Sequence, residues 1–378
     1  MRVILRRMHV FALIVGIVLI GSVLLDAFET IVLPRTVRRA IRLTTGYYWI
    51  MSGLHSMLGR INKCGRRQTI LNGFAPMMLL GLIGMWAVAM IFGYALILWA
   101  AGEPLASSRP ITGLGDGLYF SGVTFFTLGF GDVIPANGLA RFLAVSEAGL
   151  GFGFLALVIA YIPVLYSAFS RREVQMLLLD SKAGSEPTAV ELLRRHAAMK
   201  SMPQLIELLR DWERFSAELL ESYLSYPVLA YYRSQHDDQN WLHSLSAIMD
   251  TCALIECGFS GSPDWECALR FQAKATFSMA RHVVVDLAYI LDAEPESPKV
   301  DRLPMQRYRS VTLMLAQSGL ELETGDEAQA RLLETRRMYE PFIYGLSKDL
   351  VMDLPDWVSE EHVKDNWETT AWDGVKHF

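Results

Sequence analysis

The sequence DGLYFSGVTFFTLGFGD occupies residues 116–132 and lies between two long apolar stretches. It is too short to cross a bilayer and return as two helices, because one spanning helix needs about 20 apolar residues. A half-length helix followed by an extended strand fits its length, and we expect Asp116 to be the N-cap of that helix. Non-helical backbone at membrane depth is tolerated only where protein covers it or water reaches it, so the strand should line a cavity.

The second part of this stretch, Thr127-Leu128-Gly129-Phe130-Gly131, is suited to lining a pore. Glycine at alternate positions permits positive φ, so that successive carbonyl groups can point the same way. A stack of inward carbonyl oxygens, with the Thr127 hydroxyl as a further ring, can replace the hydration shell of a cation. The short helix before it would direct its partially negative C-terminus toward that cation. We name residues 127–132 the filter segment.

The filter segment resembles the pore loop of potassium channels, whose filter commonly reads Thr-Val-Gly-Tyr-Gly-Asp. Here it reads Thr-Leu-Gly-Phe-Gly-Asp, and the Gly-Phe-Gly form with leucine occurs in second pore loops of two-pore-domain channels. The resemblance implies that K⁺ binds at Thr127, Leu128, Gly129 and Phe130 as the permeant ion, with Gly131 also in the lining. It implies that Asp132, Tyr119, Phe120 and Val123 support the filter. Phe130 lacks a hydroxyl that could tie the filter to the pore helix, and Val123 stands where some members carry a carboxylate.

The resemblance extends over roughly residues 74–173 and includes the helix after the filter segment. Gly151 falls where the hinge glycine of the family's inner helix is expected, and Pro163 would kink the helix nearer its cytoplasmic end. Glu147 lies inside this apolar stretch, where a carboxylate is costly. Two interpretations of Glu147 remain open: it supports the filter from behind, or it pairs with Arg141.

Composition and charge indicate a membrane part followed by an aqueous part. The chain is 52% hydrophobic, and its mean hydropathy is +0.25. Residues 1–172 hold 15 Lys/Arg against 6 Asp/Glu, whereas residues 173–378 hold 20 against 34. We therefore predict four segments: an N-terminal transmembrane helix (1–33), a basic linker (34–73), an ion-channel pore domain (74–172) and a helical cytosolic domain (173–378).

Loop charges predict the orientation of the three expected spans, at about residues 9–33, 74–101 and 139–169. Residues 34–74 carry eight Lys/Arg and no Asp/Glu, which places this loop in the cytoplasm. The N-terminus is then outside, the C-terminal domain is cytoplasmic, and the protein is a multi-pass component of the plasma (inner) membrane. The N-terminus also resembles a secretory signal peptide, but no small-x-small cleavage site follows the apolar run.

The predicted fold class is an all-α membrane protein. It has the tetrameric potassium-channel pore fold of outer helix, pore helix, filter and inner helix, with an extra N-terminal span and an all-α cytosolic domain. A helix at 36–61 either lies at the membrane interface or packs on the protein's own cytosolic domain. Apolar residues recur at spacings of three and four residues in the rest of the chain, as in amphipathic helices. Further helices are therefore expected at 172–181, 188–200, 203–224, 238–257, 264–292, 303–322 and 326–352.

Other charged and cysteine residues fit structural roles. We expect Asp26 and Glu29 to pair with the cluster Arg35, Arg38 and Arg39. No span carries arginine at every third position, so a voltage sensor is not expected. Residues 173–378 lack the Gly-x-Gly-x-x-Gly of a nucleotide-binding sheet domain. The cysteines Cys252, Cys257 and Cys267, with His236 and His243, match no standard zinc spacing.

These observations predict a potassium-selective channel of prokaryotic type. One pore loop lines only one side of a pore, so four copies of the chain around an axis are implied. We expect no organic cofactor, no nucleic-acid partner and no enzymatic activity, while the cytosolic domain is open to an unknown ligand or partner that regulates gating. The alternatives are a nonselective cation channel and a non-conducting, membrane-anchored sensor or scaffold.

Overall fold

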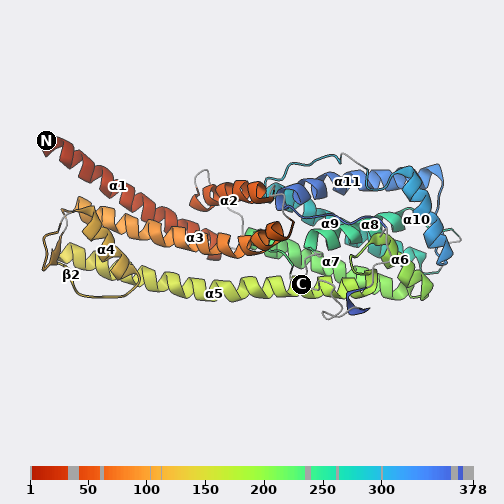
Figure 1. Ribbon diagram of the computed structural model, residues 1–378, viewed down its shortest axis with the longest axis horizontal. Coiled ribbons are helices and arrows are strands. Elements are labelled where there is room, and N and C mark those ends of the chain that lie inside the picture. Colours follow the sequence, from red (N-terminus) through yellow and green to blue (C-terminus); the bar gives the residue numbers. More distant parts are fainter. Residues whose placement is uncertain are drawn as a thin grey trace. The chain divides into compact units, whose positions relative to one another are not determined.

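The computed structural model describes residues 2–32, 42–59, 64–102, 104–111, 113–234, 240–260, 264–298, 301–358 and 365–368. Up to residue 183 the elements are α1 (Arg2–Ala27), the π-helical turn η1 (Phe28–Val32), α2 (Leu43–Gly59), α3 (Cys64–Ala100), β1 (Leu105–Ser107), α4 (Leu114–Phe125), β2 (Val133–Pro135) and α5 (Gly138–Ala183) (Figure 1). The chain divides into two compact units. The first unit contains residues 1–53 and 76–166, and the second contains residues 54–75 and 167–378.

Three helices are long and apolar enough to cross a membrane, over Arg6–Ile31, Ile70–Ala100 and Gly138–Ala183. This confirms the predicted all-α membrane protein. Helix α5 does not end near residue 172, so the prediction of a separate helix at 172–181 is wrong. Residues 170–183 contain neither glycine nor proline, and the helix continues until Gly184, whose φ is +90°.

Helices α1 and α3 pack closely because glycines face each other between them. A Cβ on Gly16 would lie 2.7 Å from the Gly93 carbonyl oxygen, and a Cβ on Gly93 would lie 2.7 Å from a side-chain carbon of Ile20. Small residues let two membrane helices approach to backbone contact. Val23 of α1 is buried with Trp86 and Tyr94 of α3 in one cluster, so the N-terminal helix lies against the outer helix of the first unit.

The half-length helix α4 begins differently from the prediction. Its N-cap is Gly113, with φ of 123° and no side-chain cap, and Asp116 lies in the first turn instead. Asp116 can still favour the helix there, because a carboxylate near a helix N-terminus interacts well with the helix dipole. After the filter segment, β2 pairs antiparallel with β1, with Leu105 opposite Pro135 and Ser107 opposite Val133.

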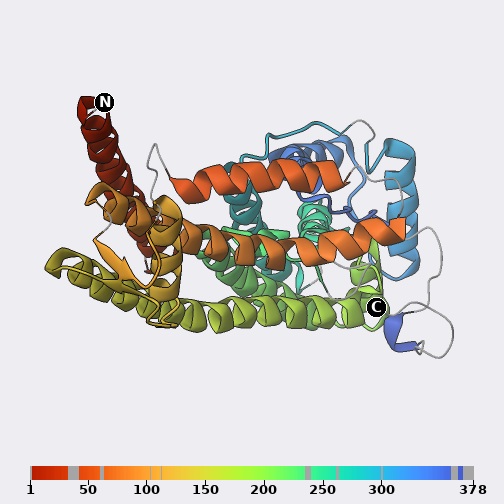
Figure 2. The same ribbon diagram turned by 60° about the vertical axis from the view of Figure 1, so that its left-hand side comes forward.

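The second unit is a helical bundle. Its elements after α5 are α6 (Ala189–Ala198), α7 (Met202–Ser225), the 3-10 turn η2 (Pro227–Tyr231), α8 (Trp241–Glu256), α9 (Glu266–Ile290), α10 (Met305–Gln317), α11 (Asp326–Leu350) and the 3-10 turn η3 (Asn366–Glu368). The predicted helices between 188 and 352 all correspond to one of α6 to α11. Helices α7, α8, α9 and α11 lie together in both ribbon views (Figures 1 and 2).

Helix α8 is the centre of this bundle. Every residue from Trp241 to Ile255 is buried, as expected for a helix that is apolar almost all round. Asn240 caps its first turn by accepting a hydrogen bond from the His243 backbone N–H at 2.7 Å. The expected start at residue 238 lies outside the described residues.

Helix α2 occupies part of the predicted 36–61 helix, and residues 36–41 and 60–61 lie outside the described residues. In the first unit, the Tyr47 hydroxyl donates to the Met78 carbonyl oxygen at 2.8 Å. In the second unit, the ring of His55 lies 4.8 Å from Phe74 and 5.3 Å from Tyr231. These contacts favour the interpretation that α2 packs on the protein itself, although Trp49, Ile50 and Met57 remain exposed on its other side.

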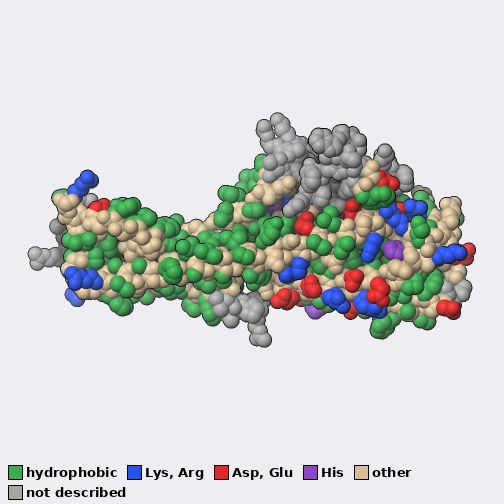
Figure 3. Space-filling view, turned by 90° about the horizontal axis from the view of Figure 1, so that it is seen from below, with side chains coloured by type: hydrophobic (Ala, Val, Ile, Leu, Met, Phe, Trp, Pro, Cys, Tyr) green, Lys and Arg blue, Asp and Glu red, His purple; other side chains and the backbone are tan. Residues whose placement is uncertain are grey.

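The surface differs between the two parts of the chain. Figure 3 shows mostly hydrophobic side chains over α4 and the first half of α5, whereas acidic and basic side chains gather over the second unit. The first surface suits lipid or a neighbouring subunit, and the second suits water.

Candidate functional site

The end of α4 is joined directly to the filter segment by backbone hydrogen bonds. The Thr127 N–H donates to the Thr124 carbonyl oxygen at 3.0 Å, and the Leu128 N–H donates to the Val123 carbonyl oxygen at 2.8 Å. The last carbonyl groups of a helix need such partners. Here the chain leaving the helix supplies them, which fixes the start of the filter segment relative to α4. Val123 therefore contributes its backbone, and its side chain is half-buried.

The filter segment has an alternating backbone. Thr127, Gly129 and Gly131 have φ of 57°, 61° and 77°, and the residues between them do not have positive φ. Glycine adopts positive φ at little cost, whereas a β-branched threonine there is a strained exception. Such strain is typical of functional sites that the surrounding structure holds in place. Leu128, Gly129, Phe130, Gly131 and Asp132 are all exposed on the single chain.

Tyr119 and Phe120 of α4, both predicted to support the filter segment, have different contacts. The Tyr119 hydroxyl donates to Asp132 Oδ2 at 2.8 Å. This bond ties the last residue of the filter segment to α4, which Phe130 cannot do for lack of a hydroxyl. Phe120 is 5% exposed and packs with Leu98, Leu105 and Ala140, so it anchors the helix to the rest of the first unit.

The hydrogen-bond partner of Glu147 lies on α4 and is not Arg141. It is fully buried on α5 and forms a short hydrogen bond with the Ser121 hydroxyl of α4. Arg141 is exposed. The structure therefore gives Glu147 a partner on α4, and its support of the filter segment stays a prediction.

Gly151 lies where α5 touches the end of α4. A Cβ on residue 151 would lie 2.1 Å from the Phe125 carbonyl oxygen, a distance that no side chain tolerates. The helix is continuous through both Gly151 and Pro163, from Gly138 to Ala183. A hinge at either residue therefore stays a prediction, while the close contact at Gly151 is a feature that the glycine pattern alone did not indicate.

Comparison with known proteins addresses this segment directly. Residues 81–167 match the family model described as an ion channel. This range contains most of α3, the whole of α4, the filter segment and more than half of α5. Residues 81–167 form an ion-channel domain.

Three curated proteins are similar to the chain over different lengths. The uncharacterized membrane protein YdjJ of Bacillus subtilis is 22% identical over 287 residues, which cover 70% of this chain and 82% of YdjJ. Protein LctB of Geobacillus stearothermophilus is 34% identical over 84 residues, covering 20% of this chain and 62% of LctB. The two pore potassium channel c of Oryza sativa is 36% identical over 59 residues, covering 16% of this chain and 13% of that protein. No solved structure matches the chain.

Before the ion-channel domain, a buried carboxylate joins three helices of the first unit. Asp26 of α1 accepts hydrogen bonds from the Thr44 backbone N–H at 2.7 Å and from Trp86 Nε1 at 3.3 Å. Arg42 lies 3.4 Å from Asp26 and 3.5 Å from Glu29. The expected pairing of these acids with Arg35, Arg38 and Arg39 falls outside the described residues, and Arg42 is the partner that the structure describes.

After the ion-channel domain, Arg172 is buried although it stands two residues beyond an exposed serine in α5. Its Nη1 donates to the Tyr223 hydroxyl at 2.9 Å and to the Leu229 carbonyl oxygen at 3.2 Å. Its Nη2 lies 3.0 Å from Glu173. Sequence reasoning missed this role, although buried residues recur at helical spacing through Arg172, Met176, Leu179 and Ala183.

Residues of the turn η2 contact both Arg172 and the aromatic rings of His55 and Phe74 within the second unit. Leu229 accepts from Arg172, and the ring of Tyr231 faces both His55 and Phe74. Burial, reinforced by nearby Arg233, lowers the pKa of His55 to about 4, so this imidazole is neutral at pH 7. We name Arg172, Tyr223, Tyr231, His55 and Phe74 with η2 the η2 junction.

The bundle also contains a buried charge network that the sequence did not reveal. Arg302 lies against Asp250 of α8, to which the Tyr339 hydroxyl of α11 also donates. Burial alone would lower the pKa of Arg302, but the attraction of Asp250 raises it above its ordinary value, so Arg302 stays charged. This network connects the central helix to α11 and to the chain before α10.

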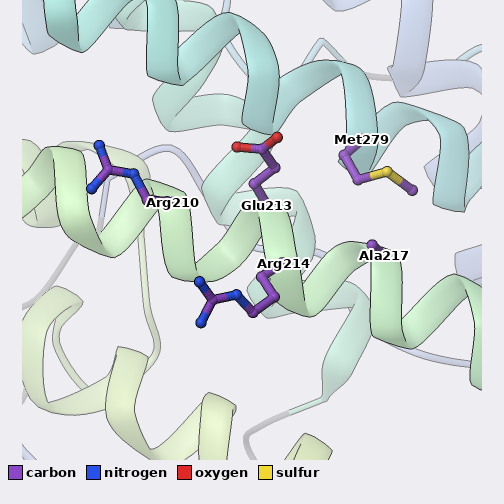
Figure 4. A pocket seen from close by; sticks show the side chains of 5 residues that line it. All are labelled: Arg210, Glu213, Arg214, Ala217 and Met279. Carbon is purple, nitrogen blue, oxygen red and sulfur yellow. The ribbon is translucent and has the colours of Figure 1, made fainter.

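No metal-binding group of three or more His, Cys, Asp or Glu occurs among the described residues. Cys252 and Cys257 are buried free thiols, Cys267 is exposed, and His236 lies outside the described residues. The His243 ring is buried and bonds to the Pro187 carbonyl oxygen. A shallow pocket of about 280 Å³ between α7 and α9 is lined by Arg210, Glu213, Arg214, Ala217 and Met279 (Figure 4), and its arginine side chains are exposed.

Proposed function

We propose that this protein is the subunit of a homotetrameric, potassium-selective channel in a prokaryotic plasma (inner) membrane. The observation that carries the proposal is the alternating backbone of the filter segment, with positive φ at residues 127, 129 and 131. Alternation of this kind suits a row of carbonyl oxygens on one side of the strand, which replaces the water around a K⁺ ion. K⁺ is the permeant ion in this proposal, held at Thr127, Leu128, Gly129 and Phe130.

Four copies are needed because a single strand of carbonyl groups lines one side of a pore. Closed rotational symmetry around the pore axis then supplies the other sides. The exposed filter segment of the single chain supports this assembly. The basic 34–74 loop supports an orientation with the N-terminus outside and the second unit in the cytoplasm.

Reversal potentials distinguish the proposal from its alternatives. In a planar bilayer with the full chain and a K⁺/Na⁺ gradient, we expect a reversal potential near the potassium equilibrium value. A value near zero would indicate a nonselective cation channel, and no current at any voltage would indicate a non-conducting sensor or scaffold.

We also propose that the second unit regulates the pore through the η2 junction. Helix α5 starts seven residues after Gly131 and remains one helix until Ala183. Within the second unit its later turns are held by Arg172, whose guanidinium is satisfied by groups of α7 and η2. A rearrangement of α7 or η2 would therefore act on the helix that also contacts α4.

The Arg172→Ala variant tests this coupling. It leaves the Tyr223 hydroxyl, the Leu229 carbonyl group and Glu173 without their buried partner. Breaking a buried ion pair costs about 3–5 kcal/mol, so we expect the ratio of open to closed channels to change by about tenfold or more. Single-channel recording of the full-length variant in bilayers measures this ratio.

Arg171→Ala is the matched control, because Arg171 is exposed and bonds to Ser167 of its own helix. Tyr223→Phe removes one acceptor while keeping the ring, and it replaces Arg172→Ala should that variant not fold. Equal open probability in all these variants and the wild type would contradict coupling through Arg172.

A further inference from the structure

The buried pair Glu147 and Ser121 joins the inner helix to the pore helix. Both residues are 0% exposed. The Ser121 hydroxyl is within hydrogen-bonding distance of two oxygen atoms, Glu147 Oε1 and the Ile91 carbonyl oxygen, the second at 2.9 Å. One hydroxyl of α4 therefore contacts both α5 and α3.

The number of hydrogens available to the two contacts favours a protonated Glu147. A serine hydroxyl has one hydrogen to donate. The Ile91 carbonyl group can only accept, and so can a carboxylate, so this one hydrogen can serve only one of the two contacts. Both contacts are hydrogen bonds at the same time only when Glu147 is a neutral acid that donates its own hydrogen to Ser121 Oγ, which leaves the serine hydrogen for Ile91. With a carboxylate at this place, one of the two contacts of Ser121 would have no hydrogen between its oxygen atoms.

The second oxygen of Glu147 agrees with a neutral acid. Glu147 Oε2 is buried, and among the described residues it has no hydrogen-bond partner. An unpaired neutral carbonyl oxygen in an apolar environment is far less costly than an unpaired carboxylate oxygen.

A second contact one turn further along holds the same two helices. Glu147 and Gly151 are four residues apart on α5, and their partners Ser121 and Phe125 are four residues apart on α4. Residues at this spacing lie on the same face of a helix. The acid bonds the two helices at one point, and the glycine lets their backbones touch at the next. Together the two points set the register of α5 against the helix whose last carbonyl groups hold the filter segment.

We propose that Glu147 is a positioning residue of the filter, acting as a neutral hydrogen-bond donor to Ser121. The relay runs from Glu147 to Ser121 and from Ser121 to the Ile91 carbonyl group, so it fixes the pore helix between the inner and outer helices. Its effect on ion selection rests on the proposed function of a potassium-selective channel.

Three variants of the full chain test the relay by reversal potential in a K⁺/Na⁺ gradient. Glu147→Leu keeps the volume but removes the donor, and Ser121→Ala removes the middle of the relay. We expect each to lower the K⁺/Na⁺ permeability ratio about fivefold to tenfold. The double variant should have the same permeability ratio as either single variant, because both substitutions interrupt the same relay. Glu147→Gln should restore the ratio of the wild type, since its amide can donate to Ser121.

Ser146→Ala is the matched control. Ser146 is the neighbouring residue of α5, and its hydroxyl contacts Tyr94 of α3 at 3.1 Å instead of the pore helix. This variant should keep the permeability ratio. A ratio unchanged in Glu147→Leu, or lowered equally in Glu147→Gln, would contradict the proposed role. A wild type without potassium selectivity would instead contradict the proposed function.

Infrared spectroscopy of the wild-type channel tests the protonation state without depending on the apolar variants. The difference spectrum between the wild type and Glu147→Gln should contain the C=O stretching band of a protonated carboxylic acid at neutral pH. A carboxylate band in its place would overturn the assignment of Glu147 as a donor.

Discussion

Replacing Gly129 with alanine should abolish potassium flux while the chain still folds and assembles. The φ of Gly129 is 61°, and an L-residue with a Cβ in the left-handed region costs roughly 1–2 kcal/mol. Four subunits would each bear that cost at the same level of the pore. The carbonyl groups on either side of residue 129 should then turn away from the alternating arrangement, so that K⁺ loses part of its substitute hydration shell. Potassium flux into liposomes, together with size-exclusion chromatography and circular dichroism, measures the loss and checks the fold.

Gly115→Ala is the matched control in the same pore loop. Gly115 lies in the first turn of α4, is exposed, and has nothing within 4 Å of the position of an added Cβ. Its variant should keep the flux of the wild type. Flux in Gly129→Ala equal to that of the wild type would show that the filter segment does not carry the ion.

The Gly151→Ala variant should disrupt the pore domain itself. The added Cβ would lie 2.1 Å from the Phe125 carbonyl oxygen, which is backbone and cannot rotate away. Overpacking of this kind costs about 1–3 kcal/mol or more in a soluble core, and here it also separates α5 from the end of α4. We expect a lower melting temperature and a loss of flux of about tenfold or more. Thermal unfolding in detergent and liposome flux measure the two effects.

The chain offers two controls on the same helix. Gly149 and Gly153 stand two residues before and after Gly151, and neither has an atom within 4 Å of an added Cβ. Alanine is a better helix former than glycine, so Gly149→Ala and Gly153→Ala should be neutral or slightly stabilising in the single chain. A Gly151→Ala variant that matches these two in stability and flux would contradict the close contact with Phe125.

Much of the fold followed from short-range patterns. Apolar length predicted the three spans, and helical periodicity predicted the helices of the second unit to within a few residues for most boundaries. The filter segment was predictable because its glycines alternate, and the structure has positive φ at Gly129 and Gly131. These properties depend on residues close together in the chain, and one sequence displays them directly.

Two helix boundaries, the end of α5 and the start of α4, were predicted incorrectly because competing local signals occur at each. The inner helix was expected to end near residue 172, where charged residues begin, but charge does not stop a helix when neither glycine nor proline follows. Asp116 was expected at the N-cap, yet Gly113 takes that position. In both places the boundary lies at a glycine with positive φ, Gly113 before α4 and Gly184 after α5.

Partners distant in the chain could not be assigned from the sequence. The carboxyl of Glu147 had two plausible partners, and the structure brings it to Ser121, 26 residues away. From the sequence, Arg172 was interpreted as one of several basic residues at a membrane boundary. In the structure it is buried against Tyr223 and Leu229. Which buried polar groups pair depends on the register of whole helices, and that register is a sum of many weak contacts.

The sequence by itself determined the chemistry of this protein: three apolar spans, a half-length helix and a segment whose glycines allow carbonyl groups to line a pore. Only the tertiary structure decided how that segment is held. It placed Tyr119 on Asp132, the acid of Glu147 on Ser121, and the bare backbone of Gly151 on Phe125. The physical reason is that backbone conformation is a property of neighbouring residues, whereas a hydrogen bond or a close contact between helices exists only once both helices are packed in register.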